Sequence, residues 1–501
     1  MGDVYSVTIE RIKAQDGDKS RLGMAALMWI SHAERPLQAH ELCYALAVEL
    51  GSTDFNPDNV PSISTLVGCC QGLITVDKEA SIVRLIHFTL QEYLSAHSDI
   101  FSRPHSAIAE ICLTYLNFQQ VKALSAELFI GAQGAPFLEY CSVYWGVHAK
   151  RELSDCARSL ALKLLKENYG KESTRFLLSQ AGESFIEYMH TPHQFSGLHC
   201  ASFFGIGEVV AALVKIGCYD TNNEDGQAHA PLAWAARNGH EEVVKILVGW
   251  EEVNPDKPDW SGQTPLHVGA WYGHARVVKI LLGRKEVSPD KPDFNGRTPL
   301  SLAAQRGHKG VVKVLLEREV NPDKADHFGQ TPLSFAAWFG HEGVVEILLG
   351  REEVSPDEPD DDGRTPLSHA AEAGHEGVTK ILLGHQEVNP DKPDNDGQTP
   401  LLYAAWNGCQ EVVKILLGRQ EVNPDRQDDD GRTPLSYAGQ TGSEGVVKIL
   451  LEREEVSPDK PDDDGQTPLS HAAWYGHEGV VKILLEQGEV NPSRSLLAMA
   501  I

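Results

Sequence analysis

The feature that most constrains this chain is a tripeptide that recurs at a fixed period. The spacing of Thr-Pro-Leu is 34 residues, and once 33. It begins at Thr264, Thr298, Thr331, Thr365, Thr399, Thr433 and Thr467. Ala230-Pro231-Leu232 and Ser196-Gly197-Leu198 lie upstream in the same phase, in degenerate form. Such a period indicates a solenoid whose units share one continuous core, and it predicts nine units.

The unit that begins at Thr264 predicts two helices and a loop. Thr264 can cap a helix whose first residue is Pro265, where a missing N–H costs nothing. Gly273 can adopt the left-handed conformation that ends this helix. Residues 275–282 are apolar on more than one side, so a second helix here needs neighbours on both flanks. Residues 287–296 are rich in Pro, Asp and Gly, which predicts a turn and an extended finger between units.

The consensus D-x-x-G-x-T-P-L-x-x-A-A-x-x-G-H-x-x-V-V-x-x-L-L of these units closely resembles that of ankyrin repeats. Most units carry one residue more than the usual repeat, in the loop after the second helix. The resemblance implies a mainly α fold, with an ankyrin-repeat array over residues 191–501. It also implies a non-enzymatic scaffold or adaptor that binds a protein partner through a concave groove.

Two positions alternate between odd and even units. Seven residues after each repeat's first position, every odd unit carries an aromatic residue and no even unit does. From the third unit on, the residue before Thr-Pro alternates between Gln and Arg. Duplication of a two-repeat segment explains the pattern by inheritance alone. In ankyrin proteins, however, similar positions face the groove, and exposed Trp and Arg are typical of binding hot spots. The candidate partner-binding residues are Trp271, Tyr272, Trp338, Phe339, Trp406, Trp474 and Tyr475, with Arg297, Arg364 and Arg432.

Acidic runs in the finger loops and histidines after glycine do not predict metal sites. The runs are Asp360 to Asp362, Asp428 to Asp430 and Asp462 to Asp464. A calcium loop needs a Glu six residues past its Gly, but His369 stands there after Gly363, so we expect solvated turns. The once-per-repeat histidines belong to the ankyrin Gly-His pair, and we expect them to be structural: His240, His274, His308, His341, His375 and His477.

Residues 19–98 have a different pattern, which predicts a winged-helix-like domain. Two amphipathic stretches separated by Pro36 and a third at about residues 63–70 predict three helices. Residues 72–77 and 81–88 are short β-rich runs that predict a hairpin, and residues 89–97 predict a further helix. A winged helix can bind DNA through its third helix, but residues 60–72 contain no basic residue, so we expect no nucleic-acid partner.

The segments RPLQAHELCYALAVE, GLITVD and RLIHFTLQEYL resemble the winged-helix domain that follows the NTPase module in fungal NACHT proteins of the STAND class. In that family a histidine of the motif H-x-(S/T)-x-Q-E-(F/Y) senses nucleotide phosphate, and His87, Thr89, Gln91, Glu92 and Tyr93 match the motif. No phosphate-binding P-loop occurs. The nearest candidate, Gly170-Lys171, lacks the required Gly and Ser or Thr, so we expect no bound nucleotide or other cofactor and a structural role for His87.

Composition bounds the remaining possibilities. The formal charge of −27 repels nucleic-acid phosphates and anionic lipid, and no apolar run is long enough to span a membrane. Nine cysteines without a C-x-x-C pair are typical of free thiols, which predicts a cytoplasmic or nuclear location. We expect the winged-helix-like domain at residues 1–103 and a helical connector at 104–190, containing residues 138–150. After Thr467, Ser495 resembles the start of a truncated tenth repeat that forms a C-terminal cap.

Three functional hypotheses therefore remain from sequence, of which the third, an unrecognised enzyme, has no catalytic constellation in its favour. The first is the protein-binding scaffold in intracellular signalling. The second is the regulatory fragment of a split NACHT signalling NTPase, of the fungal innate-immunity or incompatibility type, whose partner is a separate NACHT chain. No catalytic constellation and no metal site is expected.

Overall fold

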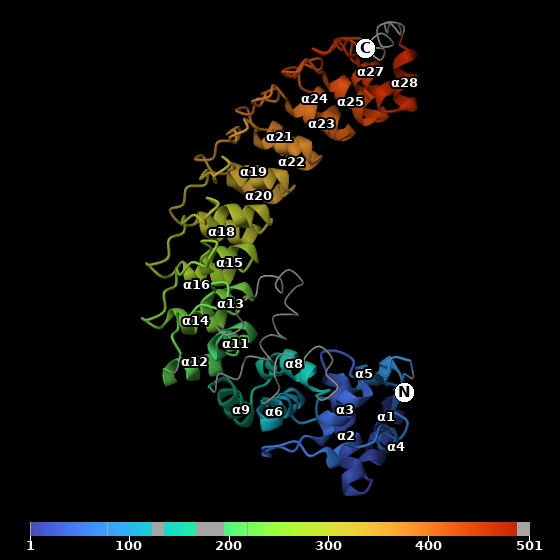
Figure 1. Cartoon of the computed structure of the whole chain (residues 1–501), viewed down its shortest axis with the longest axis vertical. Helices are drawn as coiled ribbons and strands as arrows, with labels where there is room; N and C mark the ends of the chain where they lie inside the picture. Colours follow the sequence, from blue (N-terminus) through green and yellow to red (C-terminus); the bar gives the residue numbers. More distant parts are fainter. Residues whose placement is uncertain (1, 78, 123–134, 167–194, 218, 488–501) are drawn as a thin grey trace. The chain divides into compact units, whose positions relative to one another are not determined.

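The computed structural model describes residues 2–77, 79–122, 135–166, 195–217 and 219–487 (Figure 1). The chain forms two compact units, residues 1–260 and 261–501. The predicted boundary at residue 190, the degenerate Gly170-Lys171 pair and the tail around Ser495 lie outside the described residues. None of the described helices combines the length and the hydropathy needed to cross a bilayer.

The first unit begins with the predicted three helices and hairpin. The hairpin is antiparallel, with Ile74 opposite Leu85. Its strands and the helices enclose a core in which Leu27, Leu42, Leu66 and Leu90 are fully buried. The elements are α1 Gly2–Lys13, α2 Gly17–His32, α3 Ala39–Ala47, the 3-10 helix Pro57–Asn59, α4 Ile63–Cys69, β1 Ile74–Val76, β2 Val83–Leu85 and α5 Phe88–Ala96. A winged-helix arrangement at the N-terminus is confirmed.

Helix α1 is an addition to the elements expected from sequence, which began at residue 19. Ile9 and Ile12 on this helix are buried. The hydroxyl groups of Tyr5 and Thr89 lie 2.7 Å apart and share a hydrogen bond, which ties α1 to the start of α5. The packed domain therefore includes residues before 19.

The described residues of the connector are mainly helical. It contains α6 Pro104–Asn117, α7 Gln119–Lys122, α8 Leu138–Arg151 and α9 Asp155–Lys166. Trp29 of α2 packs edge-on against Phe137 and Tyr140, with ring centroids 5.5 and 5.7 Å apart. These buried aromatic contacts join the winged helix to α8, the helix predicted at residues 138–150.

Nine helix pairs follow in the described parts of the chain. In the second unit, the loops that join the pairs lie along one edge of the array (Figure 1). The first unit holds two pairs, α11 Gly197–Phe204 with α12 Gly207–Ile216 and α13 Pro231–Arg237 with α14 Glu241–Val248. The second unit holds seven: α15 Pro265–Trp271, α16 Ala275–Leu281, α17 Pro299–Gln305, α18 Lys309–Leu316, α19 Pro332–Trp338, α20 Glu342–Leu349, α21 Pro366–Glu372, α22 Glu376–Leu383, α23 Pro400–Trp406, α24 Gln410–Leu417, α25 Pro434–Thr441, α26 Glu444–Leu451, α27 Pro468–Trp474 and α28 Glu478–Leu485.

The local chemistry of each repeat acts as the sequence predicts. In the fourth repeat the Thr298 hydroxyl accepts the N–H of Ser301 at 3.1 Å, and Pro299 opens the helix. Gly307 ends this helix with φ +73°, and a Cβ there would lie 2.6 Å from Nδ1 of His341 in the next repeat. Glycine is therefore required both for the left-handed backbone and for the close approach of the neighbouring repeat.

The fingers of the second unit are joined by backbone hydrogen bonds between successive tips. The His327 N–H donates to the Asn295 carbonyl at 2.9 Å, and the Asp361 N–H donates to the Phe328 carbonyl at 3.1 Å. The same bond joins Asp463 to Asp430 at 3.0 Å. These bonds fix the spacing of the finger tips along the array.

Candidate functional site

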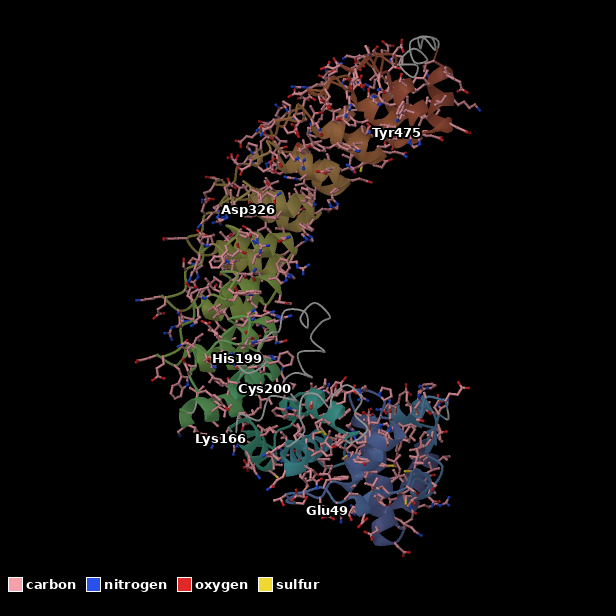
Figure 2. All side chains as sticks on the ribbon, in the orientation of Figure 1. Glu49, Lys166, His199, Cys200, Asp326 and Tyr475 are labelled. Atoms are coloured by element: carbon pink, nitrogen blue, oxygen red, sulfur yellow. The ribbon has the colours of Figure 1, made fainter. Side chains whose placement is uncertain are left out.

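The aromatic side chains predicted to bind a partner lie at the C-terminal ends of first helices in the second unit. We call Trp271, Tyr272, Trp338, Phe339, Trp406, Trp474 and Tyr475 the aromatic face. Trp271 and Trp338 are half-buried. The other five are exposed, from 41% for Tyr272 to 67% for Trp474, and Tyr475 marks this end of the ninth repeat in Figure 2. The structure thus leaves ring surface accessible in every odd repeat of this unit.

Each described tryptophan of the aromatic face before the last also contacts the next repeat. The Arg306 guanidinium carbon lies 4.0 Å from the centre of the Trp271 ring. Trp338 packs on His369 with centroids 4.7 Å apart. Trp406 stacks on Tyr437 at 5.0 Å and 16°. Because one part of each ring is held by the following repeat, these side chains are positioned before any partner arrives.

The three candidate arginines are paired with acidic groups of their own chain. Arg297 donates from Nε and Nη2 to the buried Asp293 carboxylate at 3.0 and 2.8 Å. Arg364 forms an ion pair with Glu372 at 3.6 Å, and Arg432 forms one with Asp430 at 3.5 Å. These side chains are only 21–30% exposed. They therefore contribute polar edges more than free positive charge.

The Arg364–Glu372 pair shows that the two ends of a first helix face the same side of the array. Arg364 lies just before the first helix of the sixth repeat, and Glu372 occupies the position that holds Trp in odd repeats. Since their side chains meet, both ends of a first helix open onto the same face.

The acidic finger runs are solvated turns in their second and third residues, as expected from sequence, but the expectation is wrong for the first residue of each run. The first Asp of each run is buried: Asp360, Asp428 and Asp462. Oδ1 of Asp428 accepts the N–H groups of Asp430 and Arg432, and Oδ2 accepts the Tyr437 hydroxyl at 2.6 Å. One carboxylate therefore closes the finger and fastens it to its first helix.

The same link recurs nine residues along in other repeats. Trp234 Nε1–H donates to the Asp225 carboxylate, and the Tyr403 hydroxyl donates to the Asp394 carboxylate. The imidazole Nε2 of His369 lies 2.9 Å from Asp360. In the same way, Nε2 of His471 lies 2.8 Å from Asp462. In the fourth repeat this place holds Leu302, which has no donor, and Arg297 bonds the carboxylate instead. The spacing Asp-x8-(Trp/Tyr/His) was available in the sequence as a signal.

Burial and hydrogen bonding act in opposite directions on the pKa of Asp360. Burial alone raises the pKa of Asp360, but hydrogen bonds from His369 and from the Arg364 N–H outweigh it and lower the pKa. The group is thus held as the anion that these donors require.

The Gly-His histidines are structural, as predicted. Nε2 of His308 lies 2.9 Å from the Trp271 carbonyl, and His375 makes the same contact with Trp338. His477 repeats it at the Gln440 carbonyl. Each imidazole thereby anchors the end of the preceding repeat's first helix, next to the residue that alternates.

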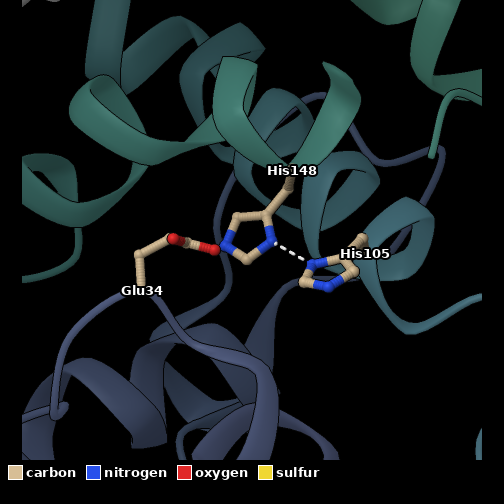
Figure 3. Close-up of side chains that lie close together, drawn as sticks. All are labelled: Glu34, His105 and His148. Carbon is tan, nitrogen blue, oxygen red and sulfur yellow. Dashed lines mark hydrogen bonds between the residues drawn. The ribbon is translucent and has the colours of Figure 1, made fainter. Parts of the chain in front are cut away.

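A second set of titratable groups lies in the first unit and was not identified from sequence. Glu34, His105 and His148 come from the loop after α2, from α6 and from α8, and their ligand-type atoms lie within 4.8 Å of one another (Figure 3). With His32, whose ring centroid is 5.5 Å from that of His105, we call these residues the histidine cluster.

The donor atoms of the histidine cluster are already engaged. The Nδ1 atoms of His105 and His148 lie 2.8 Å apart, and Nε2 of His148 lies 2.9 Å from the Tyr140 hydroxyl. Both carboxylate oxygens of Glu34 accept from the guanidinium of Arg151. These are ligand types that zinc binds, but a neighbouring arginine opposes a cation, so the set fits a hydrogen-bonded network better than a metal centre.

Burial keeps the imidazoles of this cluster uncharged. It lowers the pKa of His148 to about 3, with His105 and Arg151 adding to the effect. Burial also lowers the pKa of His32 and of His105. The network therefore joins α2, α6 and α8 through neutral imidazoles.

His87, the residue that matches the nucleotide-sensing motif, caps α5. Its Nδ1 accepts the N–H of Thr89 at 3.2 Å. It lines a pocket of about 430 Å³ together with Arg35, Arg84 and Gln91. Phe88, beside it, is 67% exposed.

Two known families match separate segments of the chain. Residues 198–293, 285–360, 352–428 and 416–494 match a family described as ankyrin repeats (3 copies). Because residues 198–494 make up more than half of the chain, the protein belongs to the ankyrin-repeat family. Residues 10–112 match a family described as the winged helix domain of GPI inositol-deacylase. Comparison with curated proteins gives no match.

Proposed function

We propose that this protein is a non-enzymatic adaptor that binds a protein partner through the aromatic face. The observation that supports the proposal most is the recurrence of exposed rings at two adjacent positions, at the end of the first helix of alternate repeats, with Trp406, Trp474 and Tyr475 the most accessible of its tryptophans and tyrosines. Rings combine large apolar area with few rotatable bonds, so they are ordered on binding at little entropic cost. We place the protein in the cytoplasm or nucleus, in intracellular signalling.

The test is affinity capture from a lysate of the source organism. The bait is the full chain, compared with a variant that carries Trp338→Ala, Trp406→Ala and Trp474→Ala. Trp260→Ala removes an exposed loop tryptophan outside the aromatic face and is the matched control. The proposal predicts that one protein is lost from the triple variant and retained by the control. Undiminished recovery by the triple variant would refute it.

A second candidate function follows from the winged helix. The sequence motifs of this domain resemble those of fungal NACHT proteins, and this resemblance and the pocket at His87 favour docking of a separate NACHT NTPase chain. Exposed Phe88 and Ile86 beside His87 give such a chain an apolar contact. Phe88→Ala would then prevent the NTPase chain from co-purifying, whereas the aromatic-face variant would not. Equal co-purification with all variants would contradict this role.

A further inference from the structure

Charge is distributed unevenly along the array of the second unit. Residues 261–330 contain 11 basic and 7 acidic residues, a formal charge of +4. Residues 331–487 contain 12 basic and 31 acidic residues, a formal charge of −19. The repeats that carry the most exposed rings therefore also carry most of the protein's net negative charge.

Part of this charge is placed at the finger tips. In repeats six to nine the tips hold seven exposed aspartates, which we call the tip aspartates: Asp361, Asp362, Asp396, Asp429, Asp430, Asp463 and Asp464. Within the described ranges, Asp430 is the one tip aspartate with a basic side chain within 4.0 Å. Tips of the preceding repeats hold exposed Phe294 and Phe328 instead. Figure 2 labels Asp326, which lies in the same finger as Phe328.

Tips and rings belong to one continuous surface. A tip lies just before a first helix, and a ring lies at the end of that helix, a helix length of about 10 Å away. The side chains of Arg364, before the helix, and Glu372, at its end, bridge this length and meet at 3.6 Å. A bound chain can therefore reach both the tip and the ring. The backbone bonds between successive tips hold the row in register with the helices.

The face already binds one guanidinium of its own. Arg306 lies over the Trp271 ring at 4.0 Å, a distance at which a cation is attracted by the ring's electron-rich face. The candidate arginines Arg297, Arg364 and Arg432, by contrast, are paired with Asp293, Glu372 and Asp430. On this surface the tip aspartates and the rings are accessible to a cation, whereas the three arginines form ion pairs within the protein.

We propose that the aromatic face of repeats five to nine binds a basic, extended polypeptide segment, whose arginines or lysines meet the tryptophan rings and the tip aspartates. This inference rests on the proposed function and specifies its partner. Rings in alternate repeats are about 20 Å apart, because each repeat advances by about one helix-packing distance of 10 Å. Six residues of an extended chain cover about 20 Å, so basic residues six apart match the rings.

The experiment is fluorescence anisotropy with the full chain and a labelled peptide whose arginines are six residues apart in a Gly/Ser/Tyr background. A peptide with Glu in place of Arg is the charge control. The tip variant carries Asp429→Asn, Asp430→Asn, Asp463→Asn and Asp464→Asn, which leaves buried Asp428 and Asp462 intact. Its matched control changes four exposed acids elsewhere, in loops after second helices, and removes the same charge: Glu352→Gln, Glu353→Gln, Glu454→Gln and Glu455→Gln.

The inference predicts that the Arg peptide binds about tenfold more tightly than the Glu peptide. It predicts that the tip variant weakens Arg-peptide binding about fivefold and the matched control less than about twofold, because local charges act more strongly than distant ones. Trp406→Ala with Trp474→Ala weakens it as well. Equal effects of the tip variant and its control would show non-specific attraction and overturn the inference.

The two proposals can fail separately. If the tryptophan variant loses the partner captured from lysate while the tip variant retains it, the aromatic face binds a partner that is not basic, and this inference is wrong. If the tryptophan variant retains the partner, the proposed function itself is wrong.

Discussion

The link between a finger and its own first helix makes a specific prediction about stability. Asp428 is buried and accepts three hydrogen bonds, from the N–H groups of Asp430 and Arg432 and from the Tyr437 hydroxyl. The perturbations are Tyr437→Phe, which removes one of these bonds, and Asp428→Ala, which removes all three.

The magnitudes follow from what each change leaves behind. A hydrogen bond to a charged group contributes about 1.5–3 kcal/mol. Tyr437→Phe leaves the Asp428 carboxylate with both backbone donors, so we expect a loss of about 1.5–2 kcal/mol. Asp428→Ala leaves three donors without their acceptor in a mostly buried place, and we expect a loss of about 3–5 kcal/mol. In the double variant the hydroxyl adds nothing, so its loss should equal that of Asp428→Ala.

The assay is native-state hydrogen exchange of the full chain, read by mass spectrometry on peptides covering residues 425–440. The free energy of local opening in this segment should fall least in Tyr437→Phe, and further and equally in Asp428→Ala and the double variant. The coupling between the two sites should be about 1.5 kcal/mol or more. Phe335→Tyr is the converse control, because Phe335 stands nine residues after Asp326 and has no hydroxyl. It should stabilise its own finger. Additive losses in the double variant would refute the reasoning.

Three further predictions concern stability. Urea unfolding should show that the first unit loses stability as pH falls below 6.5, by up to about 1.4 kcal/mol per pH unit from His148 alone. The reason is that the pKa of His148 is about 3 in the folded protein, below its unfolded value, so the unfolded chain takes up the proton first. His148→Gln should reduce this slope, and an unchanged slope would contradict the assignment. Gly307→Ala should cost about 1–2 kcal/mol through its positive φ and the imidazole of His341, whereas Gly310→Ala, with its nearest neighbour 3.6 Å away, should stay within about 1 kcal/mol of the parent in thermal unfolding. Trp234→Ala should cost about 3–5 kcal/mol, since this ring is 1% exposed, and a loss as small as that of an aromatic-face tryptophan would be inconsistent with its burial.

The repeats were predictable because the residues that begin and end each helix lie close together in the sequence. Thr caps, Pro at the first helical position and Gly at positive φ depend on residues a few positions apart, and all appear where expected. Nine copies in phase make such signals unambiguous. The winged helix was also predictable, since its hairpin and α5 have clear periodicity, although α1 was not.

The spacing Asp-x8-(Trp/Tyr/His) was present in the sequence, but the burial of the first aspartate of each finger became visible only in the fold. Burial of Asp428 depends on the neighbouring repeats, and composition alone suggested solvated turns. The pairing of Arg297 with Asp293 was likewise invisible, because Leu302 gives no hint that an arginine replaces the missing donor. The histidine cluster joins residues more than a hundred positions apart, from Glu34 to His148, which no local pattern encodes.

The central claim is that the aromatic face is the binding surface, and hydroxyl-radical footprinting of the full chain with and without its captured partner tests it most directly. Trp406, Trp474 and Tyr475 are exposed in the structure, so each is oxidised in the free protein. The account predicts that the partner protects all three while Trp260, which is 60% exposed, remains as reactive as before. Protection of Trp260 with no change at the three aromatic-face residues would contradict it.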